Sequence, residues 1–261
     1  MSSQVRLRLL PSARCLFDEP VQVKVGGLRS RQVVTMRARS TDDRGLLFSS
    51  TATYRADGRG EIHLDRDPSL GGSYVGVEPL GLLWSMRADT LHKRFIKSNS
   101  LKPHVVKFSV HEEEGEGRML AEAINERLLM GDGVGSKGLG IVSRSKAGDI
   151  ALSLASFVPE DDLNWDSKAY MELMVERLKR HGKDNFESVC YPGAGHYMEP
   201  PYGPYCPSSF NRFARMPVLW GGEARSQAAA EVHLWKKIQE FFKTYLRTES
   251  KLQKRCPPKS D

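Results

Sequence analysis

Alternating apolar and polar residues characterise the first half of the chain. Apolar side chains occupy every second position in residues 21–25, 32–39 and 105–110. A period of two is the signature of a strand with one buried face, so each run predicts a β-strand. Gly26-Gly27 supplies a turn directly after the first of these strands.

Turn signals separate further short runs in the same half. Asp57-Gly58 lies between residues 52–55 and 61–64, and this arrangement predicts a β-hairpin. Residues 119–129 fit a strand or a helix on pattern alone. Short strands at regular spacing indicate a sandwich, so we expect an immunoglobulin-like β-sandwich over residues 1–130.

The pattern changes to a mixture of short apolar runs and helical spacing after Gly131. Residues 139–142 and 186–191 read as buried strands. Residues 149–157 carry apolar side chains at helical spacing. Alternating strands and helices predict an α/β layer architecture for residues 135–247.

Two longer stretches predict amphipathic helices. In residues 167–181 the apolar side chains share one face, with Asp166 or Ser167 as the N-terminal cap and Gly182 as the stop. Residues 226–246 form a second helix, whose apolar stripe consists of Leu234, Trp235, Ile238, Phe241, Phe242 and Tyr245. We expect residues 248–261 to be a disordered basic tail.

Composition narrows the classes of function. The chain has 261 residues, of which 39% are hydrophobic and 27% charged, as in a globular protein. Net charge is +7, but the basic residues are not interleaved with aromatic ones, so we expect no nucleic-acid partner. The four cysteines show no metal or disulfide spacing, so we expect free thiols, no metal and no cofactor.

The most specific chemistry lies at a serine and a histidine. Residues 140–148 read as a strand, a sharp turn and a helix start, with Ser145 at the turn. Such an elbow exposes a serine nucleophile, and the backbone N–H of Lys146 would bind the developing oxyanion. Ser143 is a less well placed alternative. The positions flanking Ser145, Ser143 and Ala147, are small but are not the usual glycines.

A second motif, Tyr191-Pro192-Gly193-Ala194-Gly195-His196, presents a histidine on a tight loop after a strand. His196 is the candidate base. Asp162, in the loop before the first amphipathic helix, is the candidate acid that orients it, with Glu160 and Asp161 as competitors. The chain order Ser, Asp, His is that of an α/β-hydrolase.

These residues carry a resemblance to the family of acyl-CoA thioesterases and bile acid-CoA:amino acid N-acyltransferases. The matching motifs are Phe17-Asp18-Glu19-Pro20, Ser73–Pro79, Gly81–Met86, Arg180–Lys183, Cys190–His196, Glu199–Tyr202 and Trp220–Glu223. The resemblance implies a β-sandwich followed by an α/β-hydrolase domain. It places Ser145 at the nucleophile, Asp162 at the acid and His196 at the base.

The resemblance implies attack of Ser145 on an acyl-CoA thioester, an acyl-enzyme and its hydrolysis, as a serine esterase of fatty acid metabolism. In an alternative, glycine or taurine accepts the acyl group, as in an acyl-CoA:amino acid N-acyltransferase. A general carboxylesterase fits the triad but not the family motifs.

The chain is shorter than the family pattern on both sides of the elbow. A βα unit takes roughly 30 residues, so about 110 residues hold only three or four. We therefore expect a truncated hydrolase domain, and a non-catalytic remnant is a further alternative.

No run of apolar residues approaches the length of a membrane span, and the N-terminus lacks a secretory signal. The chain does not end in Ser-Lys-Leu. We expect a cytoplasmic protein, although the family also occupies peroxisomes and mitochondria.

Overall fold

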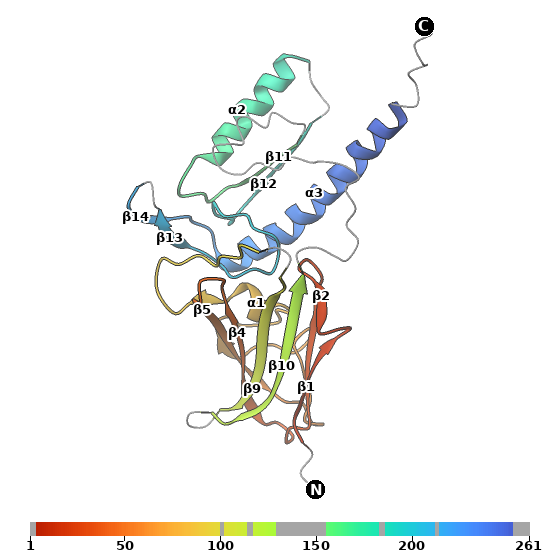
Figure 1. Ribbon diagram of the computed structural model, residues 1–261, viewed down its shortest axis with the longest axis vertical. Coiled ribbons are helices and arrows are strands. Elements are labelled where there is room, and N and C mark those ends of the chain that lie inside the picture. Colours follow the sequence, from red (N-terminus) through yellow and green to blue (C-terminus); the bar gives the residue numbers. More distant parts are fainter. Residues whose placement is uncertain are drawn as a thin grey trace. The chain divides into compact units, whose positions relative to one another are not determined.

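The computed structural model describes residues 4–99, 102–113, 117–128, 155–182, 186–211 and 214–252, with side chains left out at 155–157 and 242–252. The chain divides into two compact units (Figure 1). The first unit contains Met1–Asp132 and Glu199–Trp220, and the second contains Gly133–Met198 and Gly221–Asp261. Glu199–Trp220 therefore groups with the first unit, although its place in the sequence suggested the second.

The first unit is built from two sheets. The smaller one is antiparallel, with strand order β1-β3-β6, and its strands are β1 Arg6–Leu10, β3 Gln22–Gly26 and β6 Ile62–His63. The larger one has the order β2-β10-β9-β4-β5-β7, and β8 also pairs with β5. Its strands are β2 Arg14–Leu16, β10 Met119–Leu128, β9 His104–Glu112, β4 Val33–Thr41, β5 Leu47–Arg55, β7 Gly71–Gly72 and β8 Arg87–Ala88. Its pairs are antiparallel except β2 with β10, which is parallel.

The alternation of apolar and polar residues in the sequence matches the alternation of buried and accessible side chains in these strands. Side chains alternate between buried and accessible along β3, β4 and β5, so each contributes one face to the core. The strand predictions at 21–25, 32–39 and 105–110 are confirmed, and residues 119–128 form a strand, β10.

The predicted hairpin at Asp57-Gly58 is wrong. The turn itself exists, because the Asp57 N–H donates to the Glu61 carbonyl at 2.9 Å. However, β5 lies in the larger sheet, whereas β6 pairs with β3 in the smaller one. The Leu28 N–H donates to the Gly60 carbonyl at 3.1 Å, which ties the turn to the segment after β3. The chain thus crosses between sheets at this point.

The motif Gly81–Met86 in the first unit has a role in packing. Helix α1, Gly81–Trp84, is a single buried turn. A Cβ at Gly81 would collide with the Tyr74 ring, so only glycine allows the ring to lie there. The Tyr74 hydroxyl hydrogen-bonds Tyr54 at 2.6 Å, and burial raises the pKa of Tyr54 to about 12.

Glu199–Trp220 is held to the first unit by polar and cation–π contacts. Glu199 pairs with Arg94 at 3.1 Å, and the guanidinium of buried Arg127 lies 5.5 Å from the Tyr202 ring centroid. Arg127 also donates to the carbonyls of Phe17 (2.7 Å) and Glu19 (2.8 Å). The segment then forms an antiparallel pair, β13 Ser208–Asn211 and β14 Met216–Leu219.

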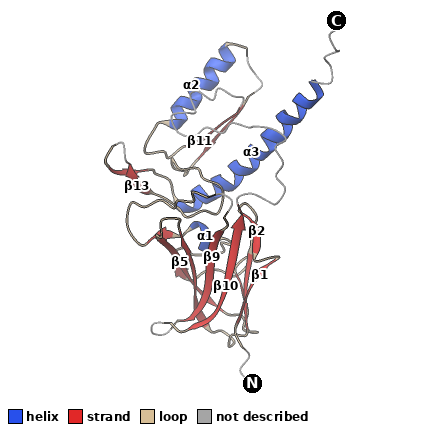
Figure 2. Ribbon diagram, in the orientation of Figure 1, coloured by secondary structure: helices blue, strands red, loops and turns tan. Residues whose placement is uncertain are grey.

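The second unit contains a β-α-β sequence with a parallel strand pair (Figure 2). Its elements are β11 Ala155–Pro159, α2 Ser167–Arg180 and β12 Glu187–Tyr191. The prediction of helix through residue 157 is wrong from 155 onward, because these residues pair in register with β12. A parallel pair with a crossover helix is the α/β arrangement.

Both predicted amphipathic helices are present. The Asp166 carboxylate caps α2 by accepting from the Ala169 N–H at 3.0 Å, and Gly182 takes a positive φ of 66° beyond its end. Helix α3, Ala224–Leu252, continues past residue 247, so the expected tail begins within it.

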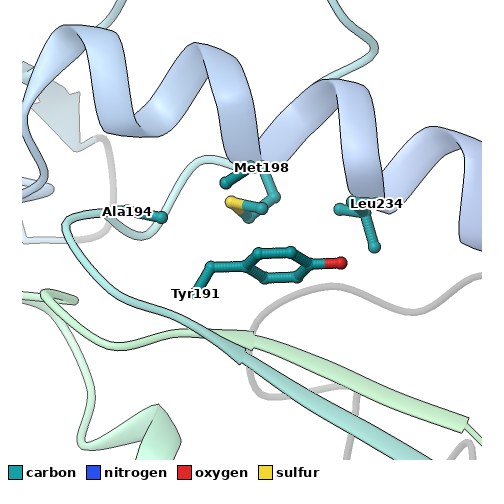
Figure 3. Close-up of a cluster of buried hydrophobic side chains, with 5 residues drawn as sticks. Tyr191, Ala194, Met198 and Leu234 are labelled. Atoms are coloured by element: carbon teal, nitrogen blue, oxygen red, sulfur yellow. The ribbon is translucent and has the colours of Figure 1, made fainter.

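Helix α3 supplies the hydrophobic cluster of the second unit. Leu234 and Ala230 pack with Tyr191, the last residue of β12, and with Ala194 and Met198 from the loop after it (Figure 3). The phenol of Tyr191 also hydrogen-bonds His233 Nδ1 at 3.0 Å. The cluster therefore fixes the loop that carries His196 against the helix.

The molecule thus combines a β-rich unit with an α/β unit, as expected. The immunoglobulin-like form of the first unit stays a prediction. Among the described residues, no helix is both long and apolar enough to cross a membrane.

Candidate active site

Asp162 and His196 lie on loops that follow two adjacent parallel strands. Asp162 follows β11 and His196 follows β12. Because these strands are parallel, both loops leave the same edge of the sheet. Backbone hydrogen bonds join the loops: the Glu160 N–H donates to Tyr191 O at 3.0 Å, and the Asp161 N–H donates to Ala194 O at 2.9 Å.

The two predicted site residues are brought together at the end of these loops. His196 Nδ1 lies 2.9 Å from Asp162 Oδ2. The side chains are 8% and 1% exposed respectively, so the contact is shielded from water. An ionised carboxylate accepts only, so Nδ1 carries the proton in this contact.

The Asp162 carboxylate is fully engaged. Oδ1 accepts from the backbone N–H groups of Asn164 (2.8 Å) and Trp165 (3.0 Å), and Oδ2 accepts from Ser167 Oγ at 2.6 Å as well as from His196. Burial alone would raise the pKa of Asp162. The hydrogen bonds from His196, Ser167 and the two backbone groups outweigh burial and hold that pKa below its ordinary value. Asp162 is therefore ionised at neutral pH.

Glycines allow three loops to meet beside this pair. A Cβ at Gly195 would collide with the Gly221 carbonyl, and one at Gly221, whose φ is 78°, would collide with the Asp161 carbonyl. A Cβ at Gly222 would strike the Gly195 N. The backbones are thus too close for any side chain, which explains the glycines in both family motifs.

Glu223 fixes the third loop at the start of α3. Its backbone N–H donates to Gly193 O at 2.8 Å. Its carboxylate accepts from the backbone N–H groups of Arg225 (2.9 Å) and Ser226 (2.8 Å). Burial raises the pKa of Glu223, but these bonds together lower it below its ordinary value.

The other predicted site residues are placed as follows. Ser145 and Lys146 lie outside the described residues. Of the three candidate acids, Asp162 is the one that hydrogen-bonds His196, whereas Glu160 pairs with Lys168. No group of three metal-binding side chains occurs in the described part of the chain.

The sequence did not identify two polar residues that support the pair, one through Asp162 and one through the loop of His196. Ser167, the first residue of α2, donates to Asp162, and Gln227 of α3 contacts the loop on both sides of His196. The spacing of Ser167 gave no signal. Gln227 did leave one, because it is a polar residue in line with the buried positions Ala230 and Leu234 of an amphipathic helix.

Comparison with known proteins identifies the class. A model of the acyl-CoA thioester hydrolase/BAAT N-terminal region matches residues 18–139, and a model of the BAAT/acyl-CoA thioester hydrolase C terminal matches residues 157–248. The chain belongs to the acyl-CoA thioesterase/BAAT family. Asp162 and His196 lie inside the second match, and Ser145 lies between the two.

Particular relatives cover nearly the whole chain. Acyl-coenzyme A thioesterase 3 of Mus musculus is 27% identical, with 91% of this chain and 94% of the relative covered. Mitochondrial acyl-coenzyme A thioesterase 2 of Homo sapiens is 26% identical, with 92% and 84% covered. The first alignment spans 405 positions although this chain has 261 residues, so a large part of the relative has no counterpart here.

Proposed function

We propose that this protein hydrolyses fatty acyl-CoA thioesters through Ser145, Asp162 and His196. The observation that carries the proposal is the shielded 2.9 Å contact between His196 and Asp162 in a chain of this family. The names of its relatives support the thioester substrate.

The steps follow from the roles of the three side chains. Asp162 holds the Nδ1–H of His196, which leaves the Nε2 lone pair to take the proton from Ser145 Oγ. The serine oxygen attacks the thioester carbon, and the Lys146 N–H stabilises the resulting oxyanion. The imidazolium returns its proton to the CoA sulfur as the C–S bond breaks. Water, deprotonated by His196, then cleaves the acyl-serine ester and releases the fatty acid.

The fold assignments extend this proposal. The first unit is an immunoglobulin-like sandwich, and the second is a truncated α/β-hydrolase domain that retains the loops for the acid and the base. The protein acts in the cytoplasm, and no cofactor takes part in the steps above.

Release of CoA tests the function. The purified chain is incubated with a long-chain acyl-CoA, and free thiol is followed with a chromogenic disulfide. Ser145→Ala and His196→Ala should abolish release, whereas Ser143→Ala, the nearby matched control, should retain it. Equal rates for the wild type and Ser145→Ala would remove Ser145 from the mechanism.

The long alignment gap favours a second candidate, a protein that binds acyl-CoA without cleaving it. Saturable binding of acyl-CoA with no CoA release from the wild type would establish this alternative. Adding glycine or taurine to the same assay tests transfer, since mass spectrometry would detect an N-acyl amino acid in place of the free acid.

A further inference from the structure

Gln227 of α3 holds the backbone on both sides of His196. Its Oε1 accepts from the Gly195 N–H at 2.7 Å, and its Nε2 donates to the Tyr197 carbonyl. Gln227 is only 5% exposed. One rigid side chain therefore fixes the residue before and the residue after the histidine.

The orientation of the Gln227 amide is determined by its surroundings. A backbone N–H needs an acceptor and a backbone carbonyl needs a donor, so Oε1 must face Gly195 and Nε2 must face Tyr197. The carboxylate of Glu231, 6% exposed, accepts from Nε2 at 3.1 Å. A flipped amide would place oxygen beside that carboxylate and leave a buried donor unpaired, at a substantial cost.

The loop needs such a support because of its composition. Gly193 and Gly195 stand just before His196, and glycine has the widest backbone freedom. The bond from His196 Nδ1 to Asp162 fixes the ring only if the backbone below it is also fixed. Gln227 supplies that constraint from a helix, whose own position is set by the cluster around Tyr191.

We propose that Gln227 is a positioning residue for His196, oriented by Glu231. Its effect on catalysis rests on the proposed function, whereas its effect on the geometry of His196 does not. It touches none of the reacting groups. It holds the backbone that carries the imidazole, so that Nδ1 meets Asp162.

Gln227→Met tests the proposal, because methionine has a similar length but neither forms the two backbone bonds nor pairs with Glu231. The proton between His196 Nδ1 and Asp162 gives a far-downfield NMR resonance, which should broaden or vanish in the variant. The kcat for CoA release should fall on the order of 100-fold, with KM unchanged. Lys236→Met, an exposed site on the same helix, should alter neither.

A second pair of variants keeps the test decisive if Gln227→Met fails to fold. Gln227→Glu retains an acceptor for Gly195 but places a carboxylate beside Glu231, and like charges at this distance repel. Adding Glu231→Gln removes the repulsion and restores an amide–carboxylate pair. The double variant should recover about tenfold in kcat over Gln227→Glu, together with the downfield resonance.

The outcomes separate this inference from the proposed function. If the wild type releases no CoA, the proposed function fails, and the resonance alone decides the role of Gln227. An unchanged resonance and unchanged kcat in folded Gln227→Met would overturn the inference. A lower melting temperature with unchanged kcat and resonance would make Gln227 merely structural and would also overturn it.

Discussion

Replacing Asp162 by asparagine should reverse the tautomer of His196. Asparagine has one acceptor oxygen and one NH2 group in place of two acceptor oxygens. The backbone N–H groups of Asn164 and Trp165, at 2.8 and 3.0 Å from Oδ1, both require an acceptor. The amide oxygen must take that side, so the NH2 group faces His196 Nδ1.

The number of backbone donors at Oδ1 sets the size of the preference for this amide orientation. The opposite orientation would leave two backbone donors facing an NH2 group, and each unpaired buried donor costs about 1–3 kcal/mol. In the favoured orientation Ser167 Oγ can rotate to accept, and His196 Nδ1 accepts as the Nε2–H tautomer. That tautomer cannot take a proton at Nε2. In triads of this kind the loss is about 10,000-fold in kcat, or roughly 5 kcal/mol of barrier.

CoA release and ¹⁵N NMR of the imidazole measure the two parts of this prediction. Asp162→Asn should lose activity by the stated factor while ¹⁵N shifts report the Nε2–H tautomer. Asp166→Asn is the matched control, because asparagine caps a helix as well as aspartate does. The reasoning fails if Asp162→Asn loses less than about tenfold in kcat or keeps the Nδ1–H tautomer.

Three further predictions concern stability. Gly221→Ala should destabilise the fold by about 3 kcal/mol or more in urea unfolding, since it adds a collision to a strained φ. Gly182→Ala has a positive φ, but no atom of the described residues lies within 4 Å of the added Cβ, so it should cost only about 1 kcal/mol, and equal losses would refute the collision. The pKa values of Asp162 and Glu223 in the folded protein lie below their ordinary values of 3.8 and 4.5. The stabilisation that these ionised carboxylates give the folded state is therefore complete above those ordinary values, and it is lost as the pH falls through the lower folded values. Unfolding free energy of Glu223→Gln should therefore depend less steeply on pH below about 4.5 than that of the wild type, and identical slopes would contradict this. Arg127→Lys should cost about 2 kcal/mol by the same assay, because one ammonium cannot replace the fork that reaches two carbonyls, and an unchanged midpoint would show that these bonds matter little.

Local pattern predicted the elements whose burial is periodic. The strands β3, β4 and β9 and the helices α2 and α3 each have one buried or amphipathic face, which the sequence displays directly. Residues 155–157 were mistaken for helix because a short apolar run fits either element. Pairing with β12, which is a non-local contact, decides in favour of a strand.

In the first unit, the sequence pattern did not predict which strands and segments come together in the tertiary structure. The turn at Asp57 has hairpin residues, yet its two strands find partners in different sheets. The composition of Glu199–Trp220 does not indicate that this segment groups with the first unit. Its attachments are individual contacts, such as Glu199 with Arg94, between residues distant in sequence.

In the candidate site, too, some residues could be predicted from the sequence and others could not. The order of the motifs and the family resemblance pointed to Asp162 and His196, which the structure places in contact. Gln227 was missed because its role depends on which loop lies opposite the helix. The glycines at 195, 221 and 222 belong to motifs that the sequence shows. Their structural reason, the close approach of three loop backbones, appears only in the structure.

Covalent labelling by a fluorophosphonate tests the central claim most directly, because such probes react with a serine only when a base activates it. The purified chain is treated with the probe, digested and analysed by mass spectrometry. We predict a phosphonyl adduct on Ser145 in the wild type and in Ser143→Ala, and none in His196→Ala. A wild type that remains unlabelled, or an adduct at Ser145 that forms equally fast without His196, would contradict the account.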